Sequence, residues 1–237
     1  MKNVMKTSDK DNNLTTPYLW RMENVLSYLE EKWKQLTAFS NKEEVKERLW
    51  NEIVECYSER ERYYHDLNHL VRLFELFERF MAHIKQPVIT GLAIFYHDIV
   101  YNTFRQDNEE KSTVKARQHL QQLNINRSLL HTIEEFILAT KTHTIPDNFP
   151  FKNDLSFFLD FDLSVLGLKW EDYFVYSYNI RKEFSQFPAA VFIDGRKQAL
   201  ERILNKPLFF LTPELRQLFE ETARENINRE LSLLQSN

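Results

Sequence analysis

Glycine is scarce in this chain, and the scarcity limits the folds open to it. Only three of the 237 residues are glycine, namely Gly91, Gly167 and Gly195, where an average usage of about 7% would give about 17. Hairpin turns and phosphate-binding loops depend on glycine because its backbone adopts positive φ angles easily. The composition therefore predicts helices joined by short polar turns. It also argues against a Rossmann or P-loop site, since neither glycine fingerprint occurs.

Apolar residues recur every three or four positions along most of the sequence, which is typical of amphipathic helices. The first predicted helix follows Thr15-Thr16-Pro17, an N-cap with proline in the first turn. Further helices are predicted from about 41 and 66 onward and over about 87–101, 107–123, 128–140, 154–166, 170–185, 188–204 and 212–234. No repeat or linker divides the chain. Residues 15–237 are therefore predicted to form one all-α domain, a helical bundle, behind a flexible polar tail over residues 1–14.

Charge and cysteine content limit the location and the partners. The net charge is −4, and acidic and basic residues are interspersed, so the basic stripe of a general nucleic-acid binder is absent. The single cysteine, Cys56, rules out an internal disulfide and fits a reducing cytosol. No apolar run approaches the roughly 18 residues that span a membrane, and residues 1–16 lack the apolar core of a signal peptide. A cytoplasmic protein without a membrane partner is predicted.

Two histidines and two aspartates form the candidate metal site: His69, His97, Asp98 and Asp162. Imidazole nitrogens and carboxylate oxygens together suit a divalent cation and leave coordination positions for water and substrate. The adjacent His-Asp pair follows the apolar stretch 92–96, where ionisable groups need partners. A shared metal ion would satisfy both.

The residues alone leave two choices open. His65 and His69 are four positions apart and share a face if this segment is helical, but both could equally be half-buried histidines at a helix start. Asp160 and Asp162 both lie in an apolar context. Spacing does not decide which member of each pair would bind a metal.

The order of these segments resembles the HD superfamily of metal-dependent phosphohydrolases, and more narrowly a small bacterial branch of predicted HD phosphohydrolases. The similarity covers roughly residues 15 to 210. The matching segments are Arg62-Tyr63-Tyr64-His65-x3-His69, His97-Asp98-Ile99-Val100-Tyr101, Asp107-Asn108-Glu109-Glu110-x-Ser112, Leu159-Asp160-x-Asp162-Leu163-Ser164-x-Leu166-Gly167 and Ile180-Arg181-x-Glu183-Phe184.

The resemblance implies a helical bundle in which a first histidine, an adjacent His-Asp pair and a distal aspartate bind a divalent metal. Cyclic-nucleotide phosphodiesterases share this fold and use the second histidine of a similar segment as the ligand. By that comparison His69 binds the metal and His65 is the proton donor. Their Asp-Leu-Ser pattern points to Asp162 as the ligand, and Asp160 becomes a supporting or second-metal candidate.

Five further residues have both a functional and a structural interpretation. Glu109 could act as general base, and Asn108 could bind substrate, although both also fit the first turn of an ordinary helix. His143 lies on a predicted loop over 142–153 and could be an additional ligand, a phosphate contact or an exposed loop residue. Arg181 and Arg196 could contact phosphate, but arginines on helices usually face solvent or form salt bridges.

The predicted function is hydrolysis of a phosphate ester, of a nucleotide or a related small molecule, by metal-activated water. Mn²⁺ is the favoured cofactor, with Fe²⁺, Co²⁺, Ni²⁺, Mg²⁺ and Zn²⁺ as alternatives. Two other functions are left open: a dinuclear-iron oxygenase, which needs His143 and Asp160 as ligands, and a metal-stabilised protein that binds a nucleotide or partner without turnover. The aromatic runs are predicted to be core or dimer surface, so a homodimer is also left open; they are Phe74, Phe77, Phe80, Phe157, Phe158 and Phe161.

Overall fold

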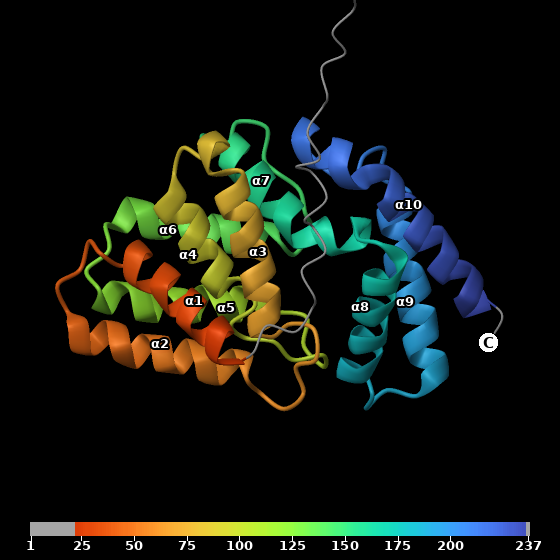
Figure 1. The fold of residues 1–237 in the computed structure, drawn as a ribbon, viewed down its shortest axis with the longest axis horizontal. Coiled ribbons are helices and arrows are strands. Elements are labelled where there is room, and N and C mark those ends of the chain that lie inside the picture. Colours follow the sequence, from red (N-terminus) through yellow and green to blue (C-terminus); the bar gives the residue numbers. More distant parts are fainter. Residues whose placement is uncertain (1–21, 236–237) are drawn as a thin grey trace, which may run out of the picture.

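A computed structural model describes residues 22–235, and every regular element in this range is a helix (Figure 1). The α-helices are α1 (Met22–Leu36), α2 (Glu43–Tyr57), α3 (Leu67–Arg79), α4 (Pro87–Tyr96), α5 (Asn108–Gln122), α6 (Arg127–Ala139), α7 (Lys152–Leu163), α8 (Trp170–Glu183), α9 (Ala189–Leu204) and α10 (Pro213–Gln235). Short 3-10 helices cover η1 (Met81–His83) and η2 (Ser164–Gly167). None of these helices is both long and apolar enough to cross a membrane. The all-α prediction is confirmed for this part of the chain.

Three sequence predictions differ from the structure or cannot be compared with it. The helix start at Thr15–Pro17 and the polar tail over 1–14 lie outside the described residues. The helix predicted over 87–101 ends at Tyr96, and Asp98 lies in the turn that follows. The turn is held by the Arg62 guanidinium, which donates hydrogen bonds to the carbonyl oxygens of Asp98 and Ile99 at 2.6 and 3.0 Å.

The apolar core is built around α4, whose residues from Ile89 to Tyr96 are all buried. Helices α1, α3, α5, α6 and α7 pack against it. Phe95 of α4 meets Trp33 of α1 edge to face, with ring centroids 5.6 Å apart, and its ring lies 4.8 Å from that of Phe74 on α3. Such aromatic pairs bury large apolar areas and fix the relative positions of the helices. The end of α4 therefore delivers its polar residues into a dry interior.

Helices α8, α9 and α10 form a second group beside the first (Figure 1). They join it through α7 and η2, and α10 packs closely on η2. At the closest approach, a Cβ atom added to Gly167 would lie 2.4 Å from the Cβ of Phe219 and 2.7 Å from its carbonyl oxygen. Two of the three glycines serve such contacts, since a Cβ on Gly91 would lie 2.6 Å from the Leu36 side chain.

Asp160 fixes the start of α10. Its carboxylate accepts hydrogen bonds from the backbone N–H groups of Leu211 and Thr212, both at 2.7 Å, and from the Thr212 hydroxyl at 2.6 Å. Leu211 and Thr212 directly precede α10, so these bonds fix the backbone and the capping residue from which the helix begins. Asp160 therefore joins α7 to α10.

Replacing Gly167 or Gly195 with alanine should have opposite effects on stability. Gly167→Ala should lower the free energy of unfolding by about 1–3 kcal/mol, because the methyl group overlaps the backbone of α10. Gly195→Ala should raise it by about 1 kcal/mol or less, because Gly195 is exposed within α9 with no atom near the added Cβ. Urea unfolding of both variants measures the difference, and equal shifts would contradict the packing of η2 on α10.

Candidate metal centre

His69 is placed by the N-cap of α3. The Asp66 carboxylate accepts hydrogen bonds from the backbone N–H groups of Asn68 and His69, at 2.9 and 3.2 Å, which is a standard way of starting a helix. The His69 ring is thereby held in the first turn and is buried. Its Nε2 atom lies 3.0 Å from Nε2 of His97.

The orientation of His97 leaves Nε2 free to act as a ligand. Its Nδ1 lies 2.9 Å from the carbonyl oxygen of Ile94, which can only accept a hydrogen bond, so Nδ1 carries the hydrogen. In the neutral ring, Nε2 therefore presents a lone pair toward His69. Two ligands at right angles, each about 2.1 Å from one ion, are about 3.0 Å apart. The observed separation fits two such ligands, and the buried Nδ1 of His69 has no hydrogen-bond partner.

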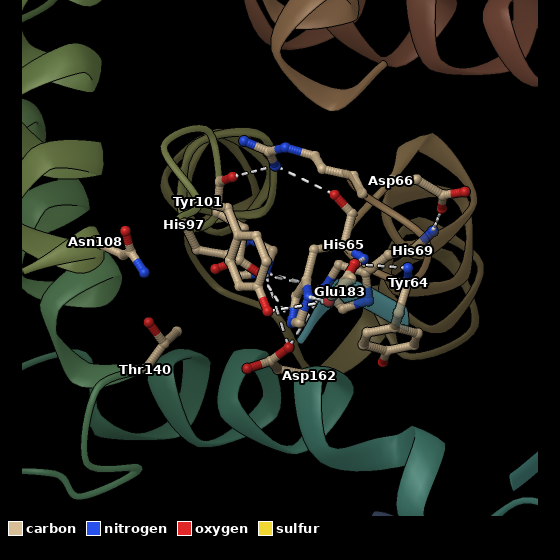
Figure 2. A network of polar contacts seen from close by, with 12 residues as sticks. Tyr64, His65, Asp66, His69, His97, Tyr101, Asn108, Thr140, Asp162 and Glu183 are labelled. Atoms are coloured by element: carbon tan, nitrogen blue, oxygen red, sulfur yellow. Dashed lines mark hydrogen bonds and ion pairs between the residues drawn. The ribbon is translucent and has the colours of Figure 1, made fainter. Parts of the chain in front are cut away.

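Both aspartates lie close to this pair of imidazoles, and Figure 2 shows Asp162 beside them. Asp162 Oδ1 lies 3.5 Å from His69 Nε2 and 3.7 Å from His97 Nε2. Asp98 Oδ2 lies 3.1 Å from His97 Nε2 and 3.8 Å from His69 Nε2. The ligand atoms of His69, His97 and Asp162 all lie within 4.8 Å of one another. These three residues could hold a metal ion, and Asp98 approaches them from the His97 side.

The charges of the cluster also suit a cation. Burial alone would lower the pKa of His97, but the Asp98 carboxylate raises it to about 9. Burial would raise the pKa values of both carboxyl groups. The charge of His97 nevertheless holds the pKa of Asp98 well below its usual range, and hydrogen bonds from His143 and His69 do the same for Asp162. The ionised carboxylates therefore favour a protonated His97. A divalent cation would replace that proton and supply the positive charge instead.

His65 lies beside the cluster and forms an ion pair with Glu183. Its Nδ1 is 2.8 Å from Glu183 Oε2, and its Nε2 is 3.9 Å from Asp98 Oδ2. Burial would lower the pKa of His65, but the charge of Glu183 raises it above its ordinary value. Burial would raise the pKa of Glu183, yet His65 lowers it to about 2. The pair is therefore a charged imidazolium and a carboxylate, with Nε2–H turned toward Asp98.

Glu183 is a site residue to which the sequence analysis gave no role. Its Oε1 accepts hydrogen bonds from the backbone N–H groups of residues 63–65, and its Oε2 accepts one from the Tyr101 hydroxyl at 3.0 Å. The Tyr101 ring stacks on His65 at 4.1 Å (Figure 2). The only sequence signal was its place in the segment Ile180-Arg181-x-Glu183-Phe184.

His143 reaches the cluster from the loop after α6. Its Nε2 lies 3.1 Å from Asp162 Oδ2. Its φ angle is 50°, a left-handed conformation that glycine normally takes at the end of a helix, and its N–H donates to the carbonyl oxygen of Ala139 at 2.8 Å. A histidine here carries conformational strain, which is most often found at functional positions.

Three residues predicted as candidates lie elsewhere. Asp160 does not face the metal cluster, because its carboxylate is bonded at the start of α10. Arg181 donates to the carbonyl oxygen of Phe184 at 2.8 Å, at the end of its own helix. Arg196 forms a buried ion pair with Glu230 at 2.8 Å. The structure therefore gives each of them a structural partner and does not bring them to the cluster.

Asn108 and Glu109 occupy the first turn of α5. The Asn108 side chain pairs with the backbone N–H and carbonyl of Asn102, at 3.1 and 3.0 Å, and so closes the loop before the helix. In Figure 2 it stands to one side of the cluster without a bond to it. Within the described residues, the Glu109 carboxylate makes no hydrogen bond or ion pair with His65 or the cluster, and its charge acts on Lys141. Their helix-start interpretation is the one that these contacts support.

Two neighbouring aspartates give a test of the metal centre. Asp162→Asn should lose most of the bound divalent cation, because it removes a negative ligand from the cluster. Asp160→Asn should lower stability through the weakened start of α10 but keep its metal. Metal content after dialysis, measured well below the melting temperature of each variant, separates the two. Equal metal loss in both would argue against the proposed ligand set.

Comparison with known proteins gives no relative: no family model, curated protein or solved structure matches this chain.

Proposed function

We propose that this chain is a metal-dependent phosphohydrolase of the HD type that cleaves the phosphate ester of a nucleotide or a related small molecule in the cytoplasm. One observation carries the proposal. Two buried histidine Nε2 atoms lie 3.0 Å apart, facing two carboxylates, and a third histidine with a raised pKa lies beside them. A cation site next to a proton donor is the arrangement that phosphate ester hydrolysis requires.

His69, His97 and Asp162 would hold the cation, together with Asp98. When bound, a divalent cation would supply Lewis acidity toward a phosphoryl oxygen and lower the pKa of water. The mixed nitrogen and oxygen donors are compatible with Mn²⁺, the cation favoured above, and with Fe²⁺, Co²⁺, Ni²⁺, Mg²⁺ and Zn²⁺ as alternatives. No cysteine contributes, which argues against a structural zinc site.

His65 would act as the general acid. Glu183 accepts a hydrogen bond from the Nδ1–H of His65, so the Nε2–H remains available to protonate the ester oxygen. As the oxygen of a water molecule bonds to phosphorus and the ester P–O bond breaks, the Nε2 proton passes to the leaving oxygen, and the alcohol leaves uncharged. A proton of the attacking water is released to solvent. The neutral imidazole then stays in place beside Glu183, because the Tyr101 ring is stacked on it.

The alternative functions have less support from the contacts. A dinuclear-iron oxygenase would need His143 and Asp160 in one ligand set, but Asp160 is bonded to Leu211 and Thr212. A binding protein without turnover would need no buried acid. Two observations favour catalysis. The pKa of His65 is raised, and its partner Glu183 is fixed in place because it accepts five hydrogen bonds.

Two substitutions should separate the ligand from the acid. Asp98→Ala should abolish metal-dependent phosphate release, because it removes a carboxylate from the cluster. His65→Ala should keep its metal and lose about 10²–10⁴-fold in kcat, as is typical for a lost general acid. Metal analysis and phosphate release from nucleotides and simple phosphate esters with Mn²⁺ provide both readouts. Loss of metal in His65→Ala with retention in His69→Ala would reverse the two assignments.

The pH profile should report the His65–Glu183 pair. The general acid must be protonated, so kcat should have its full value below the raised pKa of His65 and should fall as the pH rises through that pKa. Glu183→Gln removes the negative charge that raises this pKa, and the basic limb should move to lower pH by about 1 unit or more. A melting curve checks that the variant is folded. A basic limb unchanged by this substitution would show that His65 is not the group that titrates.

His143 should show a conflict between stability and activity. Asparagine tolerates the left-handed conformation better than histidine does, so His143→Asn should be folded to within about 1 kcal/mol of the wild type. Its kcat/KM should nevertheless fall, because the contact with Asp162 is lost. Chemical unfolding and steady-state kinetics measure the two effects. Unchanged kinetics would leave His143 as an ordinary loop residue.

A further inference from the structure

Arg72 lies between the two helices that supply His69 and Asp162. It is three residues after His69 on α3, and therefore on the same face of that helix. Its Nε donates to the Ser164 hydroxyl at 3.2 Å, and Ser164 directly follows the end of α7, two residues after Asp162. The Ser164 hydroxyl is itself fixed, because it donates to the carbonyl oxygen of Phe161 at 2.6 Å. The guanidinium is thus held at the junction of the two helices.

The two terminal nitrogens of Arg72 have no partner among residues 22–235. Within the described residues, neither Nη1 nor Nη2 makes a hydrogen bond or an ion pair. The side chain is half-buried, and the charge of Arg72 acts on Glu75, one turn along α3, without forming an ion pair. An arginine that is anchored through Nε and keeps both terminal amino groups free can bind two oxygens of a carboxylate or phosphate group at once.

Arg62 beside the cluster, and Arg181 and Arg196 further away on α8 and α9, already have partners. Arg62 binds Glu59 and the carbonyl oxygens of residues 65, 98 and 99. Arg196 is paired with Glu230, and Arg181 closes the end of α8. Lys206 is the competing cation, since it donates to the carbonyl oxygen of Thr142, next to His143, at 3.4 Å. Of these four arginines, Arg72 is the one whose two terminal nitrogens both lack a partner within the described residues.

We propose that Arg72 binds the phosphate group of the substrate through its two terminal amino groups and selects phosphomonoesters over phosphodiesters. The proposal rests on the phosphohydrolase function proposed above. A guanidinium fork binds two oxygens of one phosphate at once. A monoester has three non-bridging oxygens, so one remains to face the His69–Asp162 cluster. A diester has only two, and the fork would take both. Arg72 therefore gives a preference that a point charge would not give.

Binding of inorganic phosphate tests the proposal without requiring turnover. Calorimetric titration of the wild type and of Arg72→Ala, with and without Mn²⁺, should show a dissociation constant about 10–100-fold weaker in the variant. Arg72→Lys keeps the charge without the fork and should fall between them. Metal content should be unchanged in both. Equal phosphate affinity in wild type and Arg72→Ala would overturn the proposal, as would loss of the metal in Arg72→Ala.

Substrate preference gives the second readout. The ratio of kcat/KM for p-nitrophenyl phosphate to that for bis-p-nitrophenyl phosphate should fall in Arg72→Ala, and a ratio that does not change would overturn the selection of monoesters. Arg79→Ala is the matched control, because Arg79 is an exposed arginine at the end of the same helix. Weaker phosphate binding in Lys206→Ala but not in Arg72→Ala would also contradict the proposal.

The two proposals can fail separately. If the wild type hydrolyses neither ester but its phosphate affinity still depends on Arg72, the anion site stands and the hydrolase function is wrong. If turnover is observed and depends on His65 but not on Arg72, the hydrolase function stands and the role of Arg72 is wrong.

Discussion

The buried carboxylate of Glu183 holds the segments around the candidate metal centre together. An uncompensated charge in a protein interior costs several kcal/mol, yet this one accepts five hydrogen bonds, from three consecutive backbone N–H groups, one imidazole and one phenol. The donors lie on the segment before α3 and on Tyr101, whereas Glu183 ends α8. The position of His65 therefore depends on how α8 docks, and removing the carboxylate would release three N–H groups together with the imidazole.

Arg62 has the matching role for the other loop at the site. Its guanidinium binds the carbonyl oxygens of His65, Asp98 and Ile99, so one buried cation links the segment before α3 to the turn after α4. Both segments lack regular helix hydrogen bonds at these positions. A side chain from elsewhere satisfies their backbone groups instead, as buried polar groups require. The geometry of the site is thus set by two charged side chains, one of each sign, and less by the helices that carry the ligands.

Local patterns in the sequence predicted most of the fold, because helix spacing and glycine content are local properties. The structure brings His69, His97 and Asp162 together where they could hold a metal ion, but the choice of His69 over His65 came from the family resemblance and not from a local pattern. Asp160 and Asp162 look alike in sequence, but successive helical residues turn by about 100°, so the two carboxylates point to different neighbours. The role of Glu183 depends on contacts with residues up to 120 positions away, which no spacing rule reveals. Arg181 and Glu109 were predicted to act at the site, but each lies at a helix end, where its charge also has a local structural use.

The costs of this structure are concentrated at one place. The cluster brings two imidazoles and two carboxylates to the end of the most buried helix, leaves the Nδ1 of His69 without a partner and holds His143 in a left-handed conformation. The rest of the core is mainly aromatic and aliphatic, and within the described residues one other buried side-chain atom, Thr90 Oγ1, lacks a hydrogen-bond partner. Selection for stability alone would remove such groups, since buried polar groups and strained backbones both destabilise a fold. A bound cation would offset the repulsion between the carboxylates and give the opposed nitrogens a common partner. The same ion would therefore account for the strain in this region and for its chemistry.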